Sequence, residues 1–458
     1  MLRPTLFLAS SFVSLALLVS PAAFGETYTQ AASSWKHTCA IYGSGGLHCW
    51  GDNSSGQLGD GTTTHSAIPV VVPGLIGVTS VSAGRTHTCA LAQGVVRCWG
   101  DGADGKLGNG TVNSSPTPVS VAGLSAFSNQ VVALAVGADF SCAQMQNVLS
   151  GVGTVRCWGG NSAGQVGNGT TSPQVFAPAT VSGLTGVTHL TAGSYFACAV
   201  TGGTVRCWGS NSSGVFGNGS LIGSNAPAVA ATGITNATMV TAGGAHVCAA
   251  NGTTGDAWCW GSRSFGQLGN GTRAASDPIL TPVYFGVGFR PTKIYAGNAH
   301  TCAIVSGQAY CWGKNTAGEV GNVATGINGF VVSPLAVTGQ SSGVATMAAG
   351  LDHTCAISSA GALSCWGDNT LGQRGGAPFA AGTPVYSPIG VVKCSLDLDG
   401  DGQVLATTDA VLMARAALGY SGVALTANAL TAAAPRRTSV DLRSYLIGSC
   451  EMALPPTN

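Results

Sequence analysis

Short apolar runs, each interrupted by a glycine-containing turn, recur about every fifty residues along most of this chain. The second of these units runs apolar through 89–92 (CALA), turns at 93–94 (QG) and returns through 95–98 (VVRC). Residues that face each other across an antiparallel hairpin lie symmetrically about its turn, as they do here. The pattern predicts one β-hairpin in each unit, and a fixed period of this length is typical of repeat proteins.

Paired cysteines bracket every predicted hairpin. The chain has 16 cysteines, and fourteen of them form seven close pairs: Cys39/Cys49, Cys89/Cys98, Cys142/Cys157, Cys198/Cys207, Cys248/Cys259, Cys302/Cys311 and Cys355/Cys365. Directly opposed cysteines lie at a separation that a disulfide can span, roughly 5.5 Å between α-carbons. We predict one disulfide within each hairpin. The alternatives are reduced cysteines packed in the core and a zinc site.

The spacing within each pair predicts the length of the turn. Counting inward from the cysteines leaves two-residue loops at 93–94, 202–203 and 306–307, three-residue loops at 43–45 and 359–361, a four-residue loop at 252–255 and an eight-residue loop from Gln146 to Gly153. Glycine stands where these tight turns need a left-handed residue. The third unit therefore departs from the others.

The N-terminus has the pattern of a secretory signal peptide. A short basic start (1–3) precedes an apolar core (6–19), and a small-x-small cleavage site (23–25) lies before Glu26. The core is too short and wrongly flanked for a membrane anchor. We predict a signal peptide over residues 1–25 and a mature protein that is secreted or displayed at the cell surface. Export favours disulfides over free thiols.

Charge excludes two classes of partner. Charged residues make up 8% of the chain, the formal net charge is +1, and the longest basic run is Arg436-Arg437. Capture of nucleic acid or of an anionic membrane needs clustered Lys and Arg, so we expect neither. No segment beyond the signal peptide reaches the roughly 18 to 20 apolar residues of a membrane span. We expect a monomer that binds an extracellular or surface protein, or a glycan.

A longer motif surrounds each hairpin: AGxxHTCAxxxxGxVxCWGxNxxGQLGxGT, seen best over residues 83–111. It resembles the repeat of the regulator of chromosome condensation family, whose members form seven-bladed β-propellers. The resemblance implies an all-β, seven-bladed propeller over residues 26–393. Seven four-stranded units of this length suit a propeller on general grounds, because radial repetition leaves only short sheet edges. We expect residues 27–32 and 384–392 to be the ends that meet in the ring.

Two positions of the motif invite a functional interpretation. Histidine recurs at one place in five units: His37, His87, His246, His300 and His353. Lining the axis, these could bind a metal or titrate near neutral pH. The third and fourth units have Phe140 and Phe196 there, so we interpret the place as a packing position. Tryptophan recurs in all seven units, and we interpret it as apolar mass between blades: Trp50, Trp99, Trp158, Trp208, Trp260, Trp312 and Trp366.

The pattern changes after residue 393 to one typical of a calcium loop. Acids occupy loop positions 1, 3 and 5, glycine occupies position 6, and a backbone oxygen serves at position 7. The closing acid stands one place beyond position 12. The predicted calcium ligands are Asp397, Asp399, Asp401, Gln403 and Asp409.

This segment resembles a dockerin-like calcium module, although only one loop matches. The second half, 438–448, keeps a helix-like pattern without the acidic loop. We predict a small C-terminal α-helical calcium-binding module over residues 394–450, with a Cys394–Cys450 disulfide and a tail at 451–458.

Two functions are compatible with this organisation. The first is a secreted or cell-surface binding or scaffold protein that recognises a protein or glycan through loops on one propeller face. Its candidate loops are the places where the units differ: 146–153, 220–225, 273–284 and 323–330. The alternative is an extracellular carbohydrate-active enzyme at the propeller mouth, which would need two converging carboxylates. No nucleophile stands out and the acids lie mostly in repeat turns, so we expect no enzyme activity.

Overall fold

The structure is a computed structural model that describes residues 26–124, 129–283, 285, 290–322, 329–375 and 387–389. The predicted signal peptide (1–25), the calcium module (394–450), its Cys394–Cys450 disulfide and the tail lie outside the described residues.

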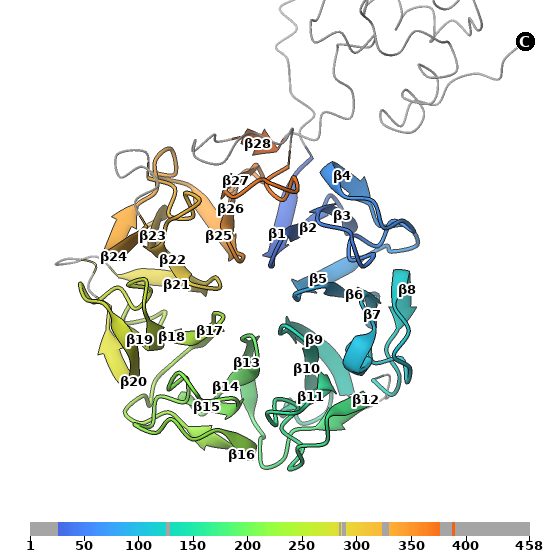
Figure 1. The fold of residues 1–458 in the computed structure, drawn as a ribbon, viewed down its shortest axis with the longest axis horizontal. Coiled ribbons are helices and arrows are strands. Elements are labelled where there is room, and N and C mark those ends of the chain that lie inside the picture. The colour runs from blue at the N-terminus through green and yellow to red at the C-terminus, as the bar shows by residue number, and fades with distance from the viewer. Residues whose placement is uncertain are drawn as a thin grey trace, which may run out of the picture.

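Seven antiparallel sheets of four strands surround a central axis (Figure 1). Each sheet consists of four strands that are consecutive in the chain, from β1–β4 in blade 1 to β25–β28 in blade 7. Across the described ranges, the one helical element is the 3-10 turn η1 (Ala103–Gly105), and no helix there is long and apolar enough to cross a bilayer. The predicted all-β, seven-bladed propeller is confirmed.

The strands fall into four concentric layers. The innermost strands are β1 (Tyr28–Ser33), β5 (Val78–Ala83), β9 (Asn129–Val136), β13 (Val187–Ala192), β17 (Met239–Ala242), β21 (Pro291–Ala296) and β25 (Val344–Ala349). The second strands are β2 (His37–Tyr42), β6 (His87–Ala92), β10 (Phe140–Asn147), β14 (Phe196–Thr201), β18 (His246–Ala250), β22 (His300–Val305) and β26 (His353–Ser358). The third strands are β3 (Gly46–Gly51), β7 (Val95–Gly100), β11 (Gly153–Gly160), β15 (Thr204–Gly209), β19 (Ala257–Arg263), β23 (Gln308–Lys314) and β27 (Leu363–Gly367). The outermost strands are β4 (Ser66–Val71), β8 (Ser115–Ser120), β12 (Gln174–Thr180), β16 (Ser224–Ala230), β20 (Ala274–Pro282), β24 (Phe330–Ala336) and β28 (Ser387–Ile389).

The seven disulfides predicted within hairpins are all present, each between the second and third strands of a blade. The fourteen cysteines are fully buried. Their α-carbons are 4.0 to 4.1 Å apart, which is less than the expected 5.5 Å. The shorter distance is that of opposed residues that do not exchange backbone hydrogen bonds, where strands approach more closely.

The turns follow the cysteine spacing in six hairpins. Gln93 and Gly94 both have positive φ (50° and 78°), as a two-residue turn of the first primed type requires. The prediction of an eight-residue loop in the third unit is wrong, because Gln146 pairs with Gly153. Asn147 then closes the tip: its N–H donates to Val152 O, and its side-chain oxygen accepts the amides of two residues in the turn.

The ring closes without exchange of strands between the first and last blades. Of the two segments expected to meet, 27–32 covers most of β1, the innermost strand of blade 1. The described part of 384–392 is β28, the outermost strand of blade 7. Closure comes from β1 packing beside β25 and β26, and from Tyr28 N–H donating to Gly361 O. Trp50 Nε1 also donates to Gln373 O at 3.0 Å, which joins blade 1 to blade 7.

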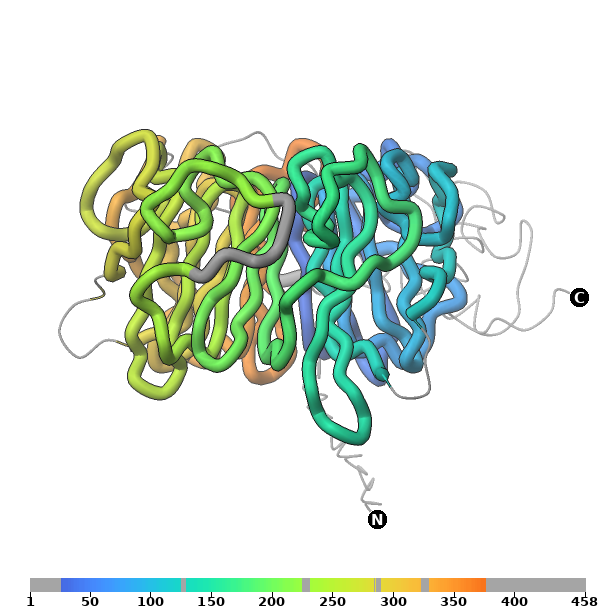
Figure 2. The backbone as a smooth tube through the Cα atoms, turned by 90° about the horizontal axis from the view of Figure 1, so that it is seen from below, coloured from blue at the N-terminus to red at the C-terminus, as the bar shows by residue number. Residues whose placement is uncertain are grey.

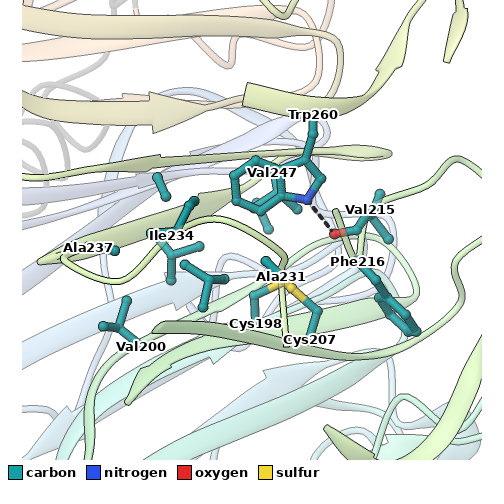
Figure 3. Close-up of a cluster of buried hydrophobic side chains, with 14 of the residues drawn as sticks. Cys198, Val200, Cys207, Val215, Phe216, Ala231, Ile234, Ala237, Val247 and Trp260 are labelled. Carbon is teal, nitrogen blue, oxygen red and sulfur yellow. Dashed lines mark hydrogen bonds between the residues drawn. A yellow bond between two sulfur atoms is a disulfide. The ribbon is translucent and has the colours of Figure 1, made fainter. Parts of the chain in front are cut away.

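The same tryptophan bond joins every pair of neighbouring blades. At the interface of blades 4 and 5, Trp260 Nε1 donates to Val215 O at 2.8 Å, above the Cys198–Cys207 disulfide (Figure 3). The other five bonds run from Trp99, Trp158, Trp208, Trp312 and Trp366 to Gln57, Lys106, Gln165, Gln267 and Glu319, respectively. All seven indoles are fully buried. The interpretation of these residues as packing between blades is confirmed, and each ring also satisfies its polar N–H.

The blades meet most closely around the axis. A Cβ placed on Gly243 of blade 5 would overlap both Gly297 O of blade 6 and the ring of His246. Glycine stands at this place in six blades, and blade 1 has Ser34, whose hydroxyl donates to Gly84 O. The close approach of the innermost turns therefore explains the Ala-Gly dipeptide that opens the motif.

Candidate functional site

The propeller has two faces of different construction. The hairpin face holds the turns between second and third strands: 43–45, 93–94, 147–152, 202–203, 251–256, 306–307 and 359–361. The loop face, at the other end of the strands, holds the turns between innermost and second strands and the long glycine-rich loops that follow the third strands. The candidate loops from the sequence are divided between these faces and the outer rim.

Hairpin β10–β11 projects beyond the rest of the hairpin face (Figure 2). Its two strands have eight residues each, whereas β6 and β7 have six. Leu149 at the tip is 92% exposed, and Val148 and Val152 are 58% and 43% exposed. No residue from 146 to 153 is charged. Segment 146–153, one of the predicted candidate loops, is therefore an exposed apolar tip.

Two other candidate loops from the sequence are 220–225 and 323–330. Residues 220–223 of segment 220–225 lie in the loop after β15 and expose Leu221 and Ile222, and its last two residues begin β16. Most of segment 323–330 lies outside the described residues, but Phe330 begins β24, and the Arg273 guanidinium lies 3.8 Å from the centre of its ring.

The interpretation of 273–284 as a variable loop is wrong. Ala274–Pro282 forms β20, the outermost strand of blade 5. Each blade needs a fourth strand after its glycine-rich loop, and two prolines are tolerated in this one because it is an edge strand. The segment differs from other units because little of an outermost strand is buried.

The axial cavity has a volume of about 360 Å³ and is lined by the innermost strands of all seven blades. Among its lining residues the only charged one is Arg85, whose guanidinium lies 4.4 Å from the centre of the Trp35 ring. No carboxylate lines this cavity, so the pair needed for glycoside hydrolysis is not found there.

The five repeated histidines are buried between blades. His300 Nε2 lies 2.8 Å from Thr354 Oγ1 of blade 7, and that hydroxyl donates to Glu319 O at 3.0 Å. Because the hydroxyl proton is used in this way, Nε2 carries the histidine proton and donates it. The other four make the same contact with a hydroxyl of the next blade: Thr88, Ser141, Thr301 or, for His353 closing the ring, Thr38.

Burial keeps these histidines neutral. Desolvation lowers the pKa of His37 to about 4 and those of His246, His300 and His353 to about 3. It also lowers the pKa of His87 well below its usual value. Across the described ranges, no group of three histidine, cysteine or acidic side chains is placed to hold a metal ion. The interpretation of the position as packing is confirmed.

Ion pairs on the loop face join two pairs of blades. Lys106 Nζ of blade 2 lies 2.7 Å from Asp101 Oδ2 and 3.3 Å from Asp139 Oδ1 of blade 3. In blades 6 and 7 the base and the acid exchange repeat positions: Lys314 stands where blade 2 has Asp101, and Glu319 where it has Lys106. Lys314 Nζ lies 3.4 Å from Glu319 Oε1 and also contacts Asp352 of blade 7. The sequence analysis missed both clusters. Aligning the seven units column by column would have revealed charged residues at matching places.

The buried carboxyl group of Glu319 is tuned by this cluster. Burial raises the pKa of Glu319, although hydrogen bonds and Lys314 oppose the shift. Burial lowers the pKa of Lys314, but the hydrogen bond to Asp352 and the two acids outweigh it, so that the pKa rises. Both pKa shifts arise from contacts at the interface of blades 6 and 7.

The predicted calcium ligands Asp397, Asp399, Asp401, Gln403 and Asp409 lie outside the described residues.

Comparison with protein families identifies the repeat. The model described as "Regulator of chromosome condensation (RCC1) repeat" matches residues 44–91, 93–144, 153–200, 254–304 and 306–357. A second model with the same description matches residues 28–57, 78–106 and 344–373. Together these matches extend from blade 1 to blade 7.

Known proteins are similar to this chain mainly in fold. Prp20p from Saccharomyces cerevisiae is similar with a TM-score of 0.65 and 21% identity, over 81% of this chain and 89% of that chain. Human WBSCR16 is similar with a TM-score of 0.61 and 21% identity, over 73% of this chain and 87% of that chain. The human probable E3 ubiquitin-protein ligase HERC4 is 31% identical over 123 residues, 26% of this chain. That match spans about a tenth of HERC4 (11%).

Proposed function

The chain belongs to the regulator of chromosome condensation (RCC1) repeat family, and we propose that it is an exported, non-catalytic propeller that binds another protein through hairpin β10–β11. The observation that carries the proposal is the projecting, uncharged tip with Leu149 almost fully exposed. Large exposed apolar groups on a soluble domain are typical of protein contact sites. Prp20p binds Gsp1p and histones, so the same fold serves elsewhere as a protein-binding scaffold.

Export is the part of this proposal that the disulfides support. The propeller has seven disulfides. Disulfides persist in oxidising compartments and are rare in reducing ones. The basic and apolar pattern of residues 1–25 supplies a route to such a compartment. We place the mature protein outside the cell or on its surface, with an extracellular protein as its partner.

The absence of acids from the axial cavity supports a binding role over catalysis. Hydrolysis of a glycosidic bond needs an acid and a base or nucleophile at a set separation, and the axial lining offers neither. The tip of β10–β11 also has no acidic, basic or histidine side chain that could act as a general acid or base. The partner should therefore be held rather than transformed.

The substitution Leu149→Asp should weaken partner binding more than tenfold. It places a charge at the centre of an apolar contact, where truncation of an anchor typically costs 2 kcal/mol or more. The mature protein is immobilised, its partner is recovered from the extracellular and surface fraction of the source cells, and the dissociation constant is then measured for each variant.

The matched control is Ile222→Asp, because Ile222 is 81% exposed but lies on the loop face. The control should bind as the unmodified protein does. Equal loss in both variants, or no loss in Leu149→Asp, would show that the hairpin tip is not the contact.

The second part of the proposal concerns calcium. We propose that Asp397, Asp399, Asp401, Gln403 and Asp409 hold one calcium ion in a C-terminal module that anchors or presents the propeller. Carboxylate and backbone oxygens are the ligands that this ion prefers, and binding to such a loop contributes directly to folding.

Chelation of calcium should unfold this module and leave the propeller folded. We expect EGTA to reduce the helical circular dichroism and remove one thermal transition, because folding is coupled to binding. A double variant, Asp397→Ala with Asp399→Ala, should already lack that transition without EGTA. Unchanged dichroism and melting after chelation would contradict the calcium site.

A further inference from the structure

A cavity of about 340 Å³ opens on the loop face where blades 4 and 5 meet, opposite the projecting hairpin. Blade 4 contributes the turn before β14 and the loop after β15, and blade 5 contributes the turn before β18 together with Ser262, Phe265 and Gln267. The turn of blade 6 before β22 completes the wall. The volume lies within the range of about 300 to 1,000 Å³ that is typical of small-molecule sites.

The cavity exists because three repeat positions carry small uncharged residues here. The interface of blades 2 and 3 is filled by Asp101, Lys106 and Asp139, and that of blades 6 and 7 by Lys314, Glu319 and Asp352. The corresponding residues at the interface of blades 4 and 5 are Ser210, Val215 and Ala245, all of which line the cavity. The interface of blades 4 and 5 therefore has a space where two other interfaces of the propeller have ion pairs.

Val215 also leaves a backbone donor without an acceptor. In five blades the residue at this position accepts the amide of the residue two places earlier, as Gln267 accepts the N–H of Phe265 at 2.9 Å. The other four accept in the same way: Gln57, Gln165, Glu319 and Gln373. Valine has no acceptor, so the Ser213 N–H has no partner in the described part of the chain, and Ser213 lines the cavity. A ligand oxygen would satisfy it.

The lining has the chemistry of a site for a neutral polyhydroxyl ligand. Tyr195 and Phe265 are 43% and 36% exposed and line the cavity, where their rings can cover the apolar C–H face of a sugar. Five serines and two amide side chains provide hydroxyl, carbonyl and N–H groups: Ser194, Ser210, Ser212, Ser213, Ser262, Gln267 and Asn298. None of the lining residues is charged, so an ionised ligand would lose water without gaining a counter-ion.

We propose that this cavity, the blade 4–5 pocket, binds one ring of a neutral saccharide, which gives the protein a glycan site separate from its protein-binding hairpin. A sugar is favoured over a peptide because hydroxyl groups dominate the polar lining and can both donate and accept. The site goes beyond the proposed protein contact, since it lies on the opposite face and shares no residue with it.

The test is calorimetric titration of the full mature protein with four trisaccharides: chitotriose, cellotriose, maltotriose and tri-galacturonic acid. At least one neutral trisaccharide should bind with a dissociation constant between about 0.1 and 1 mM, as expected for a small open site. Tri-galacturonic acid, which is charged, should bind at least tenfold more weakly. Absence of binding by every neutral probe, or preference for the acidic one, would overturn the proposal.

Two variants show whether binding is at this pocket. Val215→Gln introduces the residue that four other blades have at this position, so it should fold while filling the space, and the dissociation constant should rise more than tenfold. Gln57→Val makes the reverse change at the interface of blades 1 and 2 and should leave sugar binding unchanged. Leu149→Asp should also leave it unchanged, which separates this site from the hairpin. Sugar binding that is unchanged in Val215→Gln would overturn the assignment. So would a peptide amide that competes with the sugar for the pocket and has a lower dissociation constant.

Discussion

At pH 4 the propeller should unfold at a much lower urea concentration than at pH 7. The cause is the set of five buried histidines, which bind protons much less readily in the folded protein than in the unfolded chain, where all five are protonated at that pH. Desolvation lowers the pKa of His37 to about 4 and those of His246, His300 and His353 to about 3, from an ordinary value of 6.5. Each shift corresponds to a stability contribution on the order of 3 to 5 kcal/mol.

The pH window follows from the direction of these shifts. Below pH 6.5 the unfolded chain binds protons that the folded protein does not, so stability falls progressively as the pH drops toward 3 to 4 and is fully present above about 6.5. Neighbouring charges change the pKa values of these histidines less than burial does. Asp52 acts on His37, and Lys106 and Asp101 act on His87. Lys314 acts on His300, and Asp368 and Arg374 act on His353. The combined loss is comparable with the total stability of a domain, about 5 to 15 kcal/mol.

The chain itself supplies the control for this prediction. Blades 3 and 4 already have Phe140 and Phe196 at the histidine position, so the variant His246→Phe with His300→Phe should fold. Its urea midpoint should depend less on pH, because two of the five proton-binding sites are removed. The same midpoint at pH 4 and pH 7 in the unmodified protein would contradict this account of the histidines.

Complete reduction of the disulfides should prevent the propeller from refolding. The bridges close loops of 9 to 15 residues, and a loop of about fifteen residues is worth about 3 kcal/mol when closed. Seven such contributions exceed the usual stability of a domain. Protein that is unfolded in urea with a reductant and then diluted should therefore remain unfolded, as measured by tryptophan fluorescence, whereas oxidised protein recovers its native spectrum.

A single bridge should matter much less. The double variant Cys198→Ala with Cys207→Ala is expected to fold and to lose about 2 kcal/mol, seen as a lower urea midpoint. Reductant added without urea should act slowly, because every one of these sulfurs is buried. Equal urea midpoints for reduced and oxidised protein would show that packing alone holds the blades together.

The propeller could be predicted from the sequence because local geometry repeats in it. Cys89 and Cys98 are equidistant from Gln93-Gly94, and that symmetry is sufficient to give strands, turn and disulfide together. The phenylalanines at the histidine position similarly indicated packing before any contact was known. These inferences succeed because each depends on residues within one hairpin or on one column of the repeat.

Contacts between blades could not be read in the same way. Val215 and Ala245 line one cavity only because the ring places the loop face of one blade beside that of the next, and no local sequence pattern indicates a missing side chain. The β20 strand was misread for a related reason: an outermost strand buries little and so carries no strong apolar alternation. The shorter tip of β10–β11 depended on one asparagine that caps the turn through its side chain.

The most direct test of an exported, oxidised propeller is disulfide mapping of the protein isolated from its own cells, with free thiols alkylated before digestion. The account predicts a mature N-terminus at Glu26, no alkylated cysteine, seven bridges that each pair a hairpin cysteine with its partner in the same hairpin, and an eighth bridge between Cys394 and Cys450. Recovery of the native protein with alkylated cysteines, or with bridges between different hairpins, would contradict it.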